Sequence, residues 1–119
     1  MAEQSGADLA PSKVYARLVA LGQEWADRNA AAQLYEDTTK STLARLTLSR
    51  MEMGGCSKAQ AELEALASRD FTAHVAQAVE ARQASNRARV EYDCAKIWAE
   101  LLRSANANKR TEMQLTGMG

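Results

Sequence analysis

Few side chains in this sequence have the chemistry of a nucleophile, a proton donor or a metal ligand. The chain has one histidine, His74, and two cysteines, Cys56 and Cys94, which lie far apart. A zinc site needs three or four ligands at regular short spacings, and these residues do not form such a pattern. A His–carboxylate or Cys–His pair is formally possible after folding, but no spacing indicates one. We therefore interpret His74 as structural or solvent-facing and expect no metal or cofactor.

The acidic residues and the glycines also lack the patterns of catalytic sites. Glu62 and Glu64 are two residues apart, so they point to different faces of a helix. No Glu-x-x-His pair of the kind found in di-iron bundles is present. The phosphate-binding patterns G-x-x-x-x-G-K-[ST] and G-x-G-x-x-G are also missing from the sequence. We therefore expect that the protein is not an enzyme.

The composition indicates one all-helical domain. The chain has 119 residues, which suits a single domain, and it contains only one proline. Alanine, leucine, glutamate, lysine, glutamine and arginine are abundant, and all of them favour helices. Residues with branched β-carbons are too scarce for a sheet. The predicted fold class is all-α.

Charge, cysteine content and hydropathy limit the expected environment. Fifteen basic and fifteen acidic residues cancel, so no net field draws the chain to nucleic acid or to a membrane. Two distant cysteines form no disulfide framework, which makes a reducing cytosol the default. No apolar run approaches the ~18 residues of a membrane span, and the first part of the chain does not look like an export signal. We expect a soluble, cytoplasmic protein.

The Gly54-Gly55 pair marks a bend between helices. Glycine adopts positive φ at low cost, so either residue can end a helix in a left-handed cap. Ser57 lies three residues before Gln60, which is the S-x-x-Q spacing of a capping box. One helix is therefore predicted to end before this stretch, and another to begin after it.

A long first helix is predicted over residues 12–53. Pro11 suits a first turn, and no later proline interrupts the segment. The glycine at position 22 costs only about 1 kcal/mol inside a helix, and a break near Gly22 remains an open alternative. Four apolar residues at steps of four, three and four form one face of this helix. They are Val14, Leu18, Leu21 and Trp25.

Two more helices complete a single predicted helical domain, residues 12–115. A short one covers residues 58–67, and a long one covers residues 69–115, where Ser68 or Asp70 can provide the cap. The remaining ends, residues 1–11 and 116–119, are expected to be flexible.

One face of the last helix is predicted to carry its buried apolar residues. The large side chains recur at nearly helical spacing, and Cys94 among them is interpreted as a buried thiol. The stripe consists of Phe71, Val75, Val79, Asn86, Val90, Cys94, Ile97 and Leu101.

The two long helices are predicted to pair as an antiparallel hairpin with the short helix at its tip. If the ends near Met53 and Asp70 meet, Trp25 lies opposite Trp98. The apolar patches of the two helices then face each other, and so do their poorer stretches. This agreement between independent features supports the hairpin.

Two helices cannot enclose a core, because each buries one side only. The simplest expectation is a symmetric dimer that forms a four-helix bundle. The alternative is that the same surface binds a different protein. The predicted partner or dimer interface comprises Trp25, Leu48, Met51, Trp98 and Leu102.

A basic strip on the last helix is the candidate nucleic-acid contact. Seven cations against three acids leave a local positive excess, which suits phosphate binding. Arginines on long helices also pair with neighbouring helices, so the strip has a second interpretation. Its members are Arg82, Arg87, Arg89, Lys96, Arg103, Lys109 and Arg110.

Two stretches resemble a group of known proteins: MEMGGCSKAQAELEALAS, residues 51–68, and YDCAKIWAELLRSANANKRTEMQ, residues 92–114. They resemble small helical proteins of unassigned function encoded by phages and prophages, often among early genes for recombination or replication. The resemblance implies a phage accessory protein in the bacterial host cytoplasm and transfers no functional residues. We therefore expect a non-enzymatic interaction protein that docks on a host or phage DNA-processing or defence complex, with DNA binding in recombination or replication as the alternative.

Overall fold

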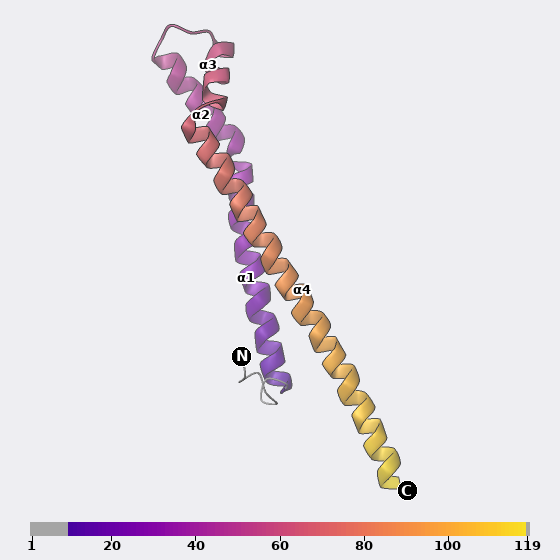
Figure 1. Ribbon diagram of the computed structural model, residues 1–119. Coiled ribbons are helices and arrows are strands. Elements are labelled where there is room, and N and C mark those ends of the chain that lie inside the picture. Colours follow the sequence, from indigo (N-terminus) through magenta and orange to yellow (C-terminus); the bar gives the residue numbers. More distant parts are fainter. Residues whose placement is uncertain (1–9, 119) are drawn as a thin grey trace. The chain divides into compact units, whose positions relative to one another are not determined.

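The computed structural model describes residues 10–118, and these residues form four helices connected by short turns (Figure 1). Residues 10–118 contain no strand, which confirms the all-α prediction. No helix of this part of the chain combines the length and the apolar character needed to cross a membrane. The helices are α1 (Pro11–Asp37), α2 (Thr39–Glu52), α3 (Lys58–Leu66) and α4 (Arg69–Met118).

The predicted flexible ends are only partly covered by the structure. Residues 1–9 and residue 119 lie outside the described residues. Pro11 is the first residue of α1, so the predicted start of this helix at residue 12 was nearly right. The predicted end at residue 115 was wrong, because α4 continues through Gly117 to Met118.

The predicted long helix over residues 12–53 is present in bent form, with an interruption at Thr38 that divides it into α1 and α2. Gly22 lies inside α1, whereas α1 ends at Asp37 and α2 begins at Thr39. The Thr38 hydroxyl donates to the Leu34 carbonyl at 2.8 Å, and the Thr39 hydroxyl donates to the Tyr35 carbonyl at 2.9 Å. Hydroxyls that bond back to carbonyls one turn earlier bend helices. Two consecutive threonines therefore account for the position of the break.

The Gly54-Gly55 bend has the predicted geometry. Gly54 has φ 83° and Gly55 has φ 84°, a region that other residues rarely adopt. The Ser57 hydroxyl accepts a hydrogen bond from the Gln60 amide at 3.2 Å, which is one half of the predicted capping box. The short helix that follows ends at Leu66, one residue before the predicted limit.

Ser68 is the residue that caps the last helix. Its hydroxyl accepts from the Phe71 amide at 3.2 Å and donates to the Ala65 carbonyl at 2.6 Å. One side chain therefore satisfies backbone groups at the end of α3 and at the start of α4. Asp70 adds a negative charge to the first turn, where the helix dipole favours it.

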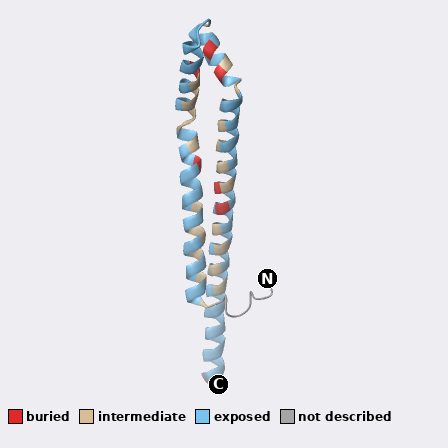
Figure 2. Cartoon of the chain, turned by 90° about the vertical axis from the view of Figure 1, so that its left-hand side faces the viewer, coloured by how far each residue is buried: buried red, intermediate tan, exposed pale blue. Residues whose placement is uncertain are grey.

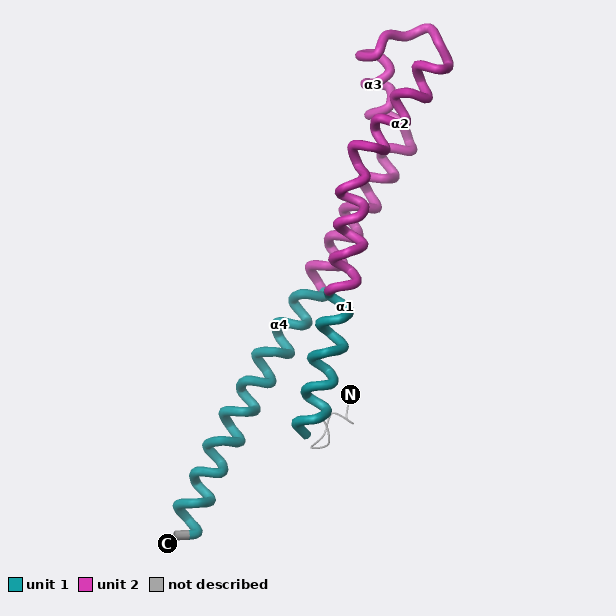
Figure 3. Tube along the Cα trace, turned by 180° about the vertical axis from the view of Figure 1, so that it is seen from behind, with its two compact units in different colours: residues 1–25, 88–119 teal, residues 26–87 magenta. Residues whose placement is uncertain are grey.

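The chain divides into two compact units (Figure 3). Unit 2 comprises residues 26–87, and unit 1 comprises the chain up to Trp25 together with the chain from Ala88 onwards. Each unit combines a segment of α1 with a segment of α4. Within unit 2, α2 and α3 pack against each other.

Small side chains form the buried core of the described residues (Figure 2). Thr47 is also buried, and its hydroxyl is satisfied because it donates to the Leu43 carbonyl at 2.8 Å. Small residues let helix backbones approach closely, so these contacts bury little apolar area. The exposed fractions are 0% for Ala32, Ala61 and Ala65, 1% for Ser85, 5% for Thr47 and 7% for Ala88.

Helix α4 buries a different face from the predicted one. A face with alternating steps of three and four residues, the spacing of a coiled-coil seam, is buried or half-buried along the helix. We call this face the α4 seam. It consists of Phe71, His74, Ala78, Ala81, Ser85, Ala88, Tyr92, Ala95, Ala99 and Leu102.

Apart from Phe71, the predicted stripe of α4 is exposed. Val79, Val90 and Leu101 of the predicted stripe follow one another at intervals of eleven residues, whereas the seam repeats every seven residues. The two patterns therefore occupy different sides of one helix. Cys94 belongs to the exposed stripe, so the prediction of a buried thiol was wrong. The exposed members are Val75, Val79, Asn86, Val90, Cys94, Ile97 and Leu101.

The predicted pairing register was wrong as well. In unit 1, Trp25 packs on Tyr92 with ring centroids 5.7 Å apart, not on Trp98. In unit 2, Tyr35 contacts His74 edge to face at 5.8 Å. The prediction assumed that the two long arms meet at their ends. Instead, the nine residues of α3 pack along α2, so the pairing of α4 starts closer to the N-terminus of the chain than assumed.

Candidate protein-interaction surface

The exposed apolar residues of α4 form a continuous stripe in unit 1. Steps of four, three and four residues place them on one side of the helix, away from the seam residues Tyr92 and Ala99. One member of the stripe, Cys94, is an exposed free thiol. We call Val90, Cys94, Ile97 and Leu101 the α4 outer stripe, in which the exposed fractions are 54% for Val90, 58% for Ile97 and 58% for Leu101.

Charged residues of alternating sign follow one flank of the outer stripe. Each of them precedes a member of the stripe by one residue, and all are exposed. Within residues 10–118, none of them takes part in an ion pair. Their charges are therefore available to a partner that binds the stripe. The flank consists of Arg89, Asp93, Lys96 and Glu100.

The five residues of the predicted interface divide into two groups. Leu48 is 60% exposed, Met51 is 39% exposed and Trp98 is 55% exposed, so these three remain available. Trp25 and Leu102 are half-buried. Trp25 packs on Tyr92 within unit 1, and Leu102 belongs to the α4 seam.

The Tyr92 ring also explains why position 22 carries a glycine inside a helix. A side-chain carbon on Gly22 would lie 3.3 Å from the ring of Tyr92, which is closer than ordinary van der Waals contact. The glycine therefore provides the space that the ring uses next to Trp25.

His74, which was predicted to be structural or solvent-facing, contacts Tyr35. Its Nε2 atom lies 3.0 Å from the carbonyl oxygen of Tyr35, and its ring contacts the Tyr35 ring. The contact joins α1 to α4 within unit 2. The histidine is half-buried, and its ring packs against Tyr35.

Arg82, the first residue of the predicted basic strip, makes contacts within unit 2. Arg82 donates to both carboxylate oxygens of Glu36, at 2.9 and 2.8 Å, and to the Asn29 side-chain oxygen at 2.8 Å. A bidentate contact of this kind holds the guanidinium in a fixed orientation. Arg82 therefore joins α4 to α1 inside unit 2, so its guanidinium already has partners within the chain. The other members, Arg87, Arg89, Lys96, Arg103, Lys109 and Arg110, are exposed.

The Glu36–Arg82 pair makes stability depend on pH in a defined direction. The hydrogen bond from Arg82 lowers the pKa of the Glu36 carboxyl below its ordinary value, and the attraction of the charge adds to this effect. A lowered pKa in the folded state contributes stability above the unfolded-state pKa, and this contribution is lost as the pH falls through the folded-state pKa.

We therefore expect Glu36→Gln to destabilise the protein at neutral pH and to have a smaller effect in acid. Urea unfolding of both proteins at several pH values between neutral and acidic conditions measures the difference. Because other carboxylates titrate in the same range, the gap between the two proteins is the readout. A gap that stays constant with pH would contradict the assigned role of the ion pair.

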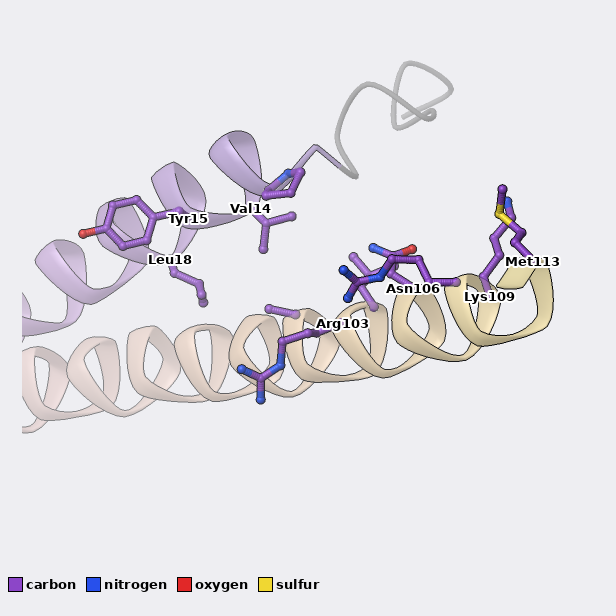
Figure 4. Close-up of a pocket in the computed structure, with 11 residues that line it drawn as sticks. Val14, Tyr15, Leu18, Arg103, Asn106, Lys109 and Met113 are labelled. Carbon is purple, nitrogen blue, oxygen red and sulfur yellow. The ribbon is translucent and has the colours of Figure 1, made fainter. Parts of the chain in front are cut away.

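Unit 1 also contains an open groove of about 680 Å³ between the first turns of α1 and the last part of α4 (Figure 4). Val14 and Leu18 point from α1 toward α4 and provide an apolar wall together with Leu102. Arg103 and Lys109 lie at the same groove. Part of the basic strip therefore borders an apolar surface.

Comparisons of the chain with protein-family models, with curated proteins and with solved structures found no match. Within residues 10–118, no three His, Cys, Asp or Glu side chains gather into a group that could hold a metal ion. The inference about function therefore depends on the surfaces described above.

Proposed function

We propose that this chain is a non-enzymatic interaction protein that docks on another protein chain through the α4 outer stripe. The observation that carries this proposal is an inversion of the usual distribution of side chains. The fully buried residues are alanines, a serine and a threonine, whereas Ile97, Trp98 and Leu101 are more than half exposed. Contiguous apolar surface of this kind marks interaction sites in water-soluble proteins.

The finer architecture that we propose is one long antiparallel hairpin built from α1, α2 and α4, with α3 at its tip. Such a hairpin has an unpaired apolar side that a second hairpin can cover, which gives a dimer. Within unit 2, the exposed Leu48 and Met51 of α2 provide a further apolar surface. The resemblance to phage and prophage early-region proteins supports a role in a host or phage DNA-processing or defence complex in the bacterial cytoplasm.

The double variant Ile97→Glu/Leu101→Glu tests the docking surface. Both side chains are exposed, so we expect the helix content to remain unchanged while association through the stripe is lost. The measurements are sedimentation of the purified chain and affinity capture from bacterial lysate with wild-type and variant protein. The matched control is Ala107→Glu/Gln114→Glu, which adds the same charge to exposed positions on another side of α4. Equal association and equal capture by all three proteins would refute the proposal.

DNA binding is the alternative, and the structure weakens its basis. Arg82 is occupied by Glu36, and Asp93 and Glu100 interrupt the remaining cations of the strip. Salt-dependent retention on double-stranded DNA separates the two functions, because phosphate contacts weaken steeply with salt. Retention at low salt that is lost in Arg87→Glu/Arg89→Glu/Arg103→Glu would favour the alternative.

A further inference from the structure

The α4 outer stripe and its charged flank are complementary to themselves. We propose that the stripe of one chain binds the stripe of a second copy, with the two α4 helices antiparallel and the two-fold axis close to Cys94. This inference rests on the proposed function, in which the stripe docks on a protein, and it names that protein as another copy of the same chain. A two-fold interface requires that one patch match itself.

The centre of the stripe can pair with itself in a register that the charged flank also supports. In an antiparallel helix pair, opposed positions are related by a common midpoint. With the midpoint near Cys94, Val90 of one copy lies opposite the partner's Ile97, and Ile97 lies opposite the partner's Val90. The two small Cys94 side chains then face each other at the axis. The exposed members at the centre of the stripe thereby acquire apolar neighbours.

The charged flank agrees with the same register. Residues that flank the contact face in antiparallel helices meet the equivalent flank of the partner, where opposite charges form interhelical ion pairs. Arg89 then faces the partner's Glu100, and Lys96 faces the partner's Asp93. The two-fold symmetry repeats both pairs, which gives four ion pairs. The midpoint of these pairs differs from that of the apolar residues by about one residue, which is about 1.5 Å along the helix axis and within the reach of the long charged side chains.

A contact on the side of the stripe away from the charged flank favours this register over the register in which the partner is shifted by seven residues. With the axis at Cys94, the partner's Arg87 is offset from the exposed Trp98 by about 4.5 Å along the helix axis, within the reach of its long side chain, and the two can form a cation–π contact. Shifting the partner by seven residues preserves the number of ion pairs but places Val90 opposite the partner's Ser104. The same shift separates the two Cys94 residues by about 10 Å along the helix axis. A cross-link between the cysteines therefore distinguishes the registers.

The first test is disulfide formation in the full chain. A disulfide requires Cα atoms no more than about 7 Å apart, so mild copper-catalysed oxidation at micromolar concentration should yield a covalent dimer. We expect Cys56→Ser to retain this dimer and Cys94→Ser to lose it. A short bis-maleimide should give the same result. A non-covalent dimer without a Cys94 cross-link would overturn the proposed register.

The second test exchanges the charges of one ion pair. Arg89→Glu places like charges opposite each other twice per dimer, and we expect the dissociation constant from sedimentation to rise about tenfold. The double variant Arg89→Glu/Glu100→Arg should restore association, because the pair is re-formed with its charges reversed. The matched control is Arg110→Glu, which makes the same change where no charged residue of the partner lies opposite. Equal weakening by Arg89→Glu and Arg110→Glu, or no rescue, would overturn the pairing.

The outcomes separate this inference from the function on which it rests. If the wild-type chain sediments as a monomer, but Ile97→Glu/Leu101→Glu abolishes the capture of another protein, the stripe is a docking site and the inference of a second copy is wrong. If the variant changes neither sedimentation nor capture, both proposals are wrong. Loss of dimer in the variant together with the Cys94 cross-link in the wild type supports both.

Discussion

Replacing Gly54 and Gly55 together by valine is expected to destabilise unit 2 by about 2–4 kcal/mol, because each left-handed residue with a side chain costs roughly 1–2 kcal/mol. Both glycines have positive φ, at 83° and 84°. A side-chain carbon at either position would meet no atom within 4 Å. The cost therefore arises from the backbone alone. Urea unfolding followed by circular dichroism measures it.

The matched control for this prediction is the double asparagine variant. Asparagine tolerates the left-handed region far better than a residue with a branched β-carbon, so Gly54→Asn/Gly55→Asn should lose much less stability. Both variants fill the same empty space around the bend. If the two variants were equally unstable, side-chain contacts rather than φ would determine the effect, and the assigned role of the glycines would be wrong.

The limits of α3 and the start of α4 could be predicted from the sequence because their causes are local. The Ser57 hydroxyl meets an amide three residues further along the chain, and so does the Ser68 hydroxyl. The left-handed bend needs only the glycine pair itself. A pattern of a few neighbouring residues therefore contains all the information required, and the limits of α3 followed to within one residue.

The buried face of α4 could not be predicted by looking for large apolar side chains. The α4 seam consists mostly of small residues, among them Ala78, Ser85 and Ala88, which bury little surface individually. The larger Val90 and Ile97 follow another period and are exposed. The signal that was missed is the recurrence of small residues every seven positions, which is the repeat of a coiled coil.

The break at Thr38 has a local cause in its two threonines, whereas the pairing register depends on contacts between distant parts of the chain. The Tyr35 carbonyl accepts from the Thr39 hydroxyl and also lies 3.0 Å from His74. The back-bonding threonines were visible in the sequence, but the histidine that meets the same carbonyl was not. The packing of α3 along α2 was equally hidden, and it moves the whole pairing of α4.

The candidate site was partly predictable from the sequence, because the grouping of side chains on a helix face depends only on local spacing. Helical periodicity grouped the residues of the α4 outer stripe correctly, since side chains three and four residues apart share a face. Periodicity does not show whether a face meets its own chain or a partner. Similarly, the basic strip included Arg82, whose partners Glu36 and Asn29 belong to a distant segment and could not be inferred from spacing.

Ala32→Leu is the substitution that tests the close packing of small residues most directly. Ala32 is completely buried inside unit 2. A leucine there must either move the adjacent backbone or adopt an unfavourable rotamer, and overpacking of this kind costs about 1–3 kcal/mol. We expect the midpoint of urea unfolding to fall by the corresponding amount, without loss of helix content in the folded state.

Ala31→Leu provides the matched control, because Ala31 is exposed on the same helix turn. Alanine and leucine have similar helix propensities, so this change should alter the stability by less than about 0.5 kcal/mol. Two models of this alanine-rich stretch therefore make different predictions. If the alanines merely occupy a loosely packed surface, both leucines are tolerated. If Ala32 lies in a seam where backbones approach closely, only Ala32→Leu is costly, and the small residue is what permits the contact.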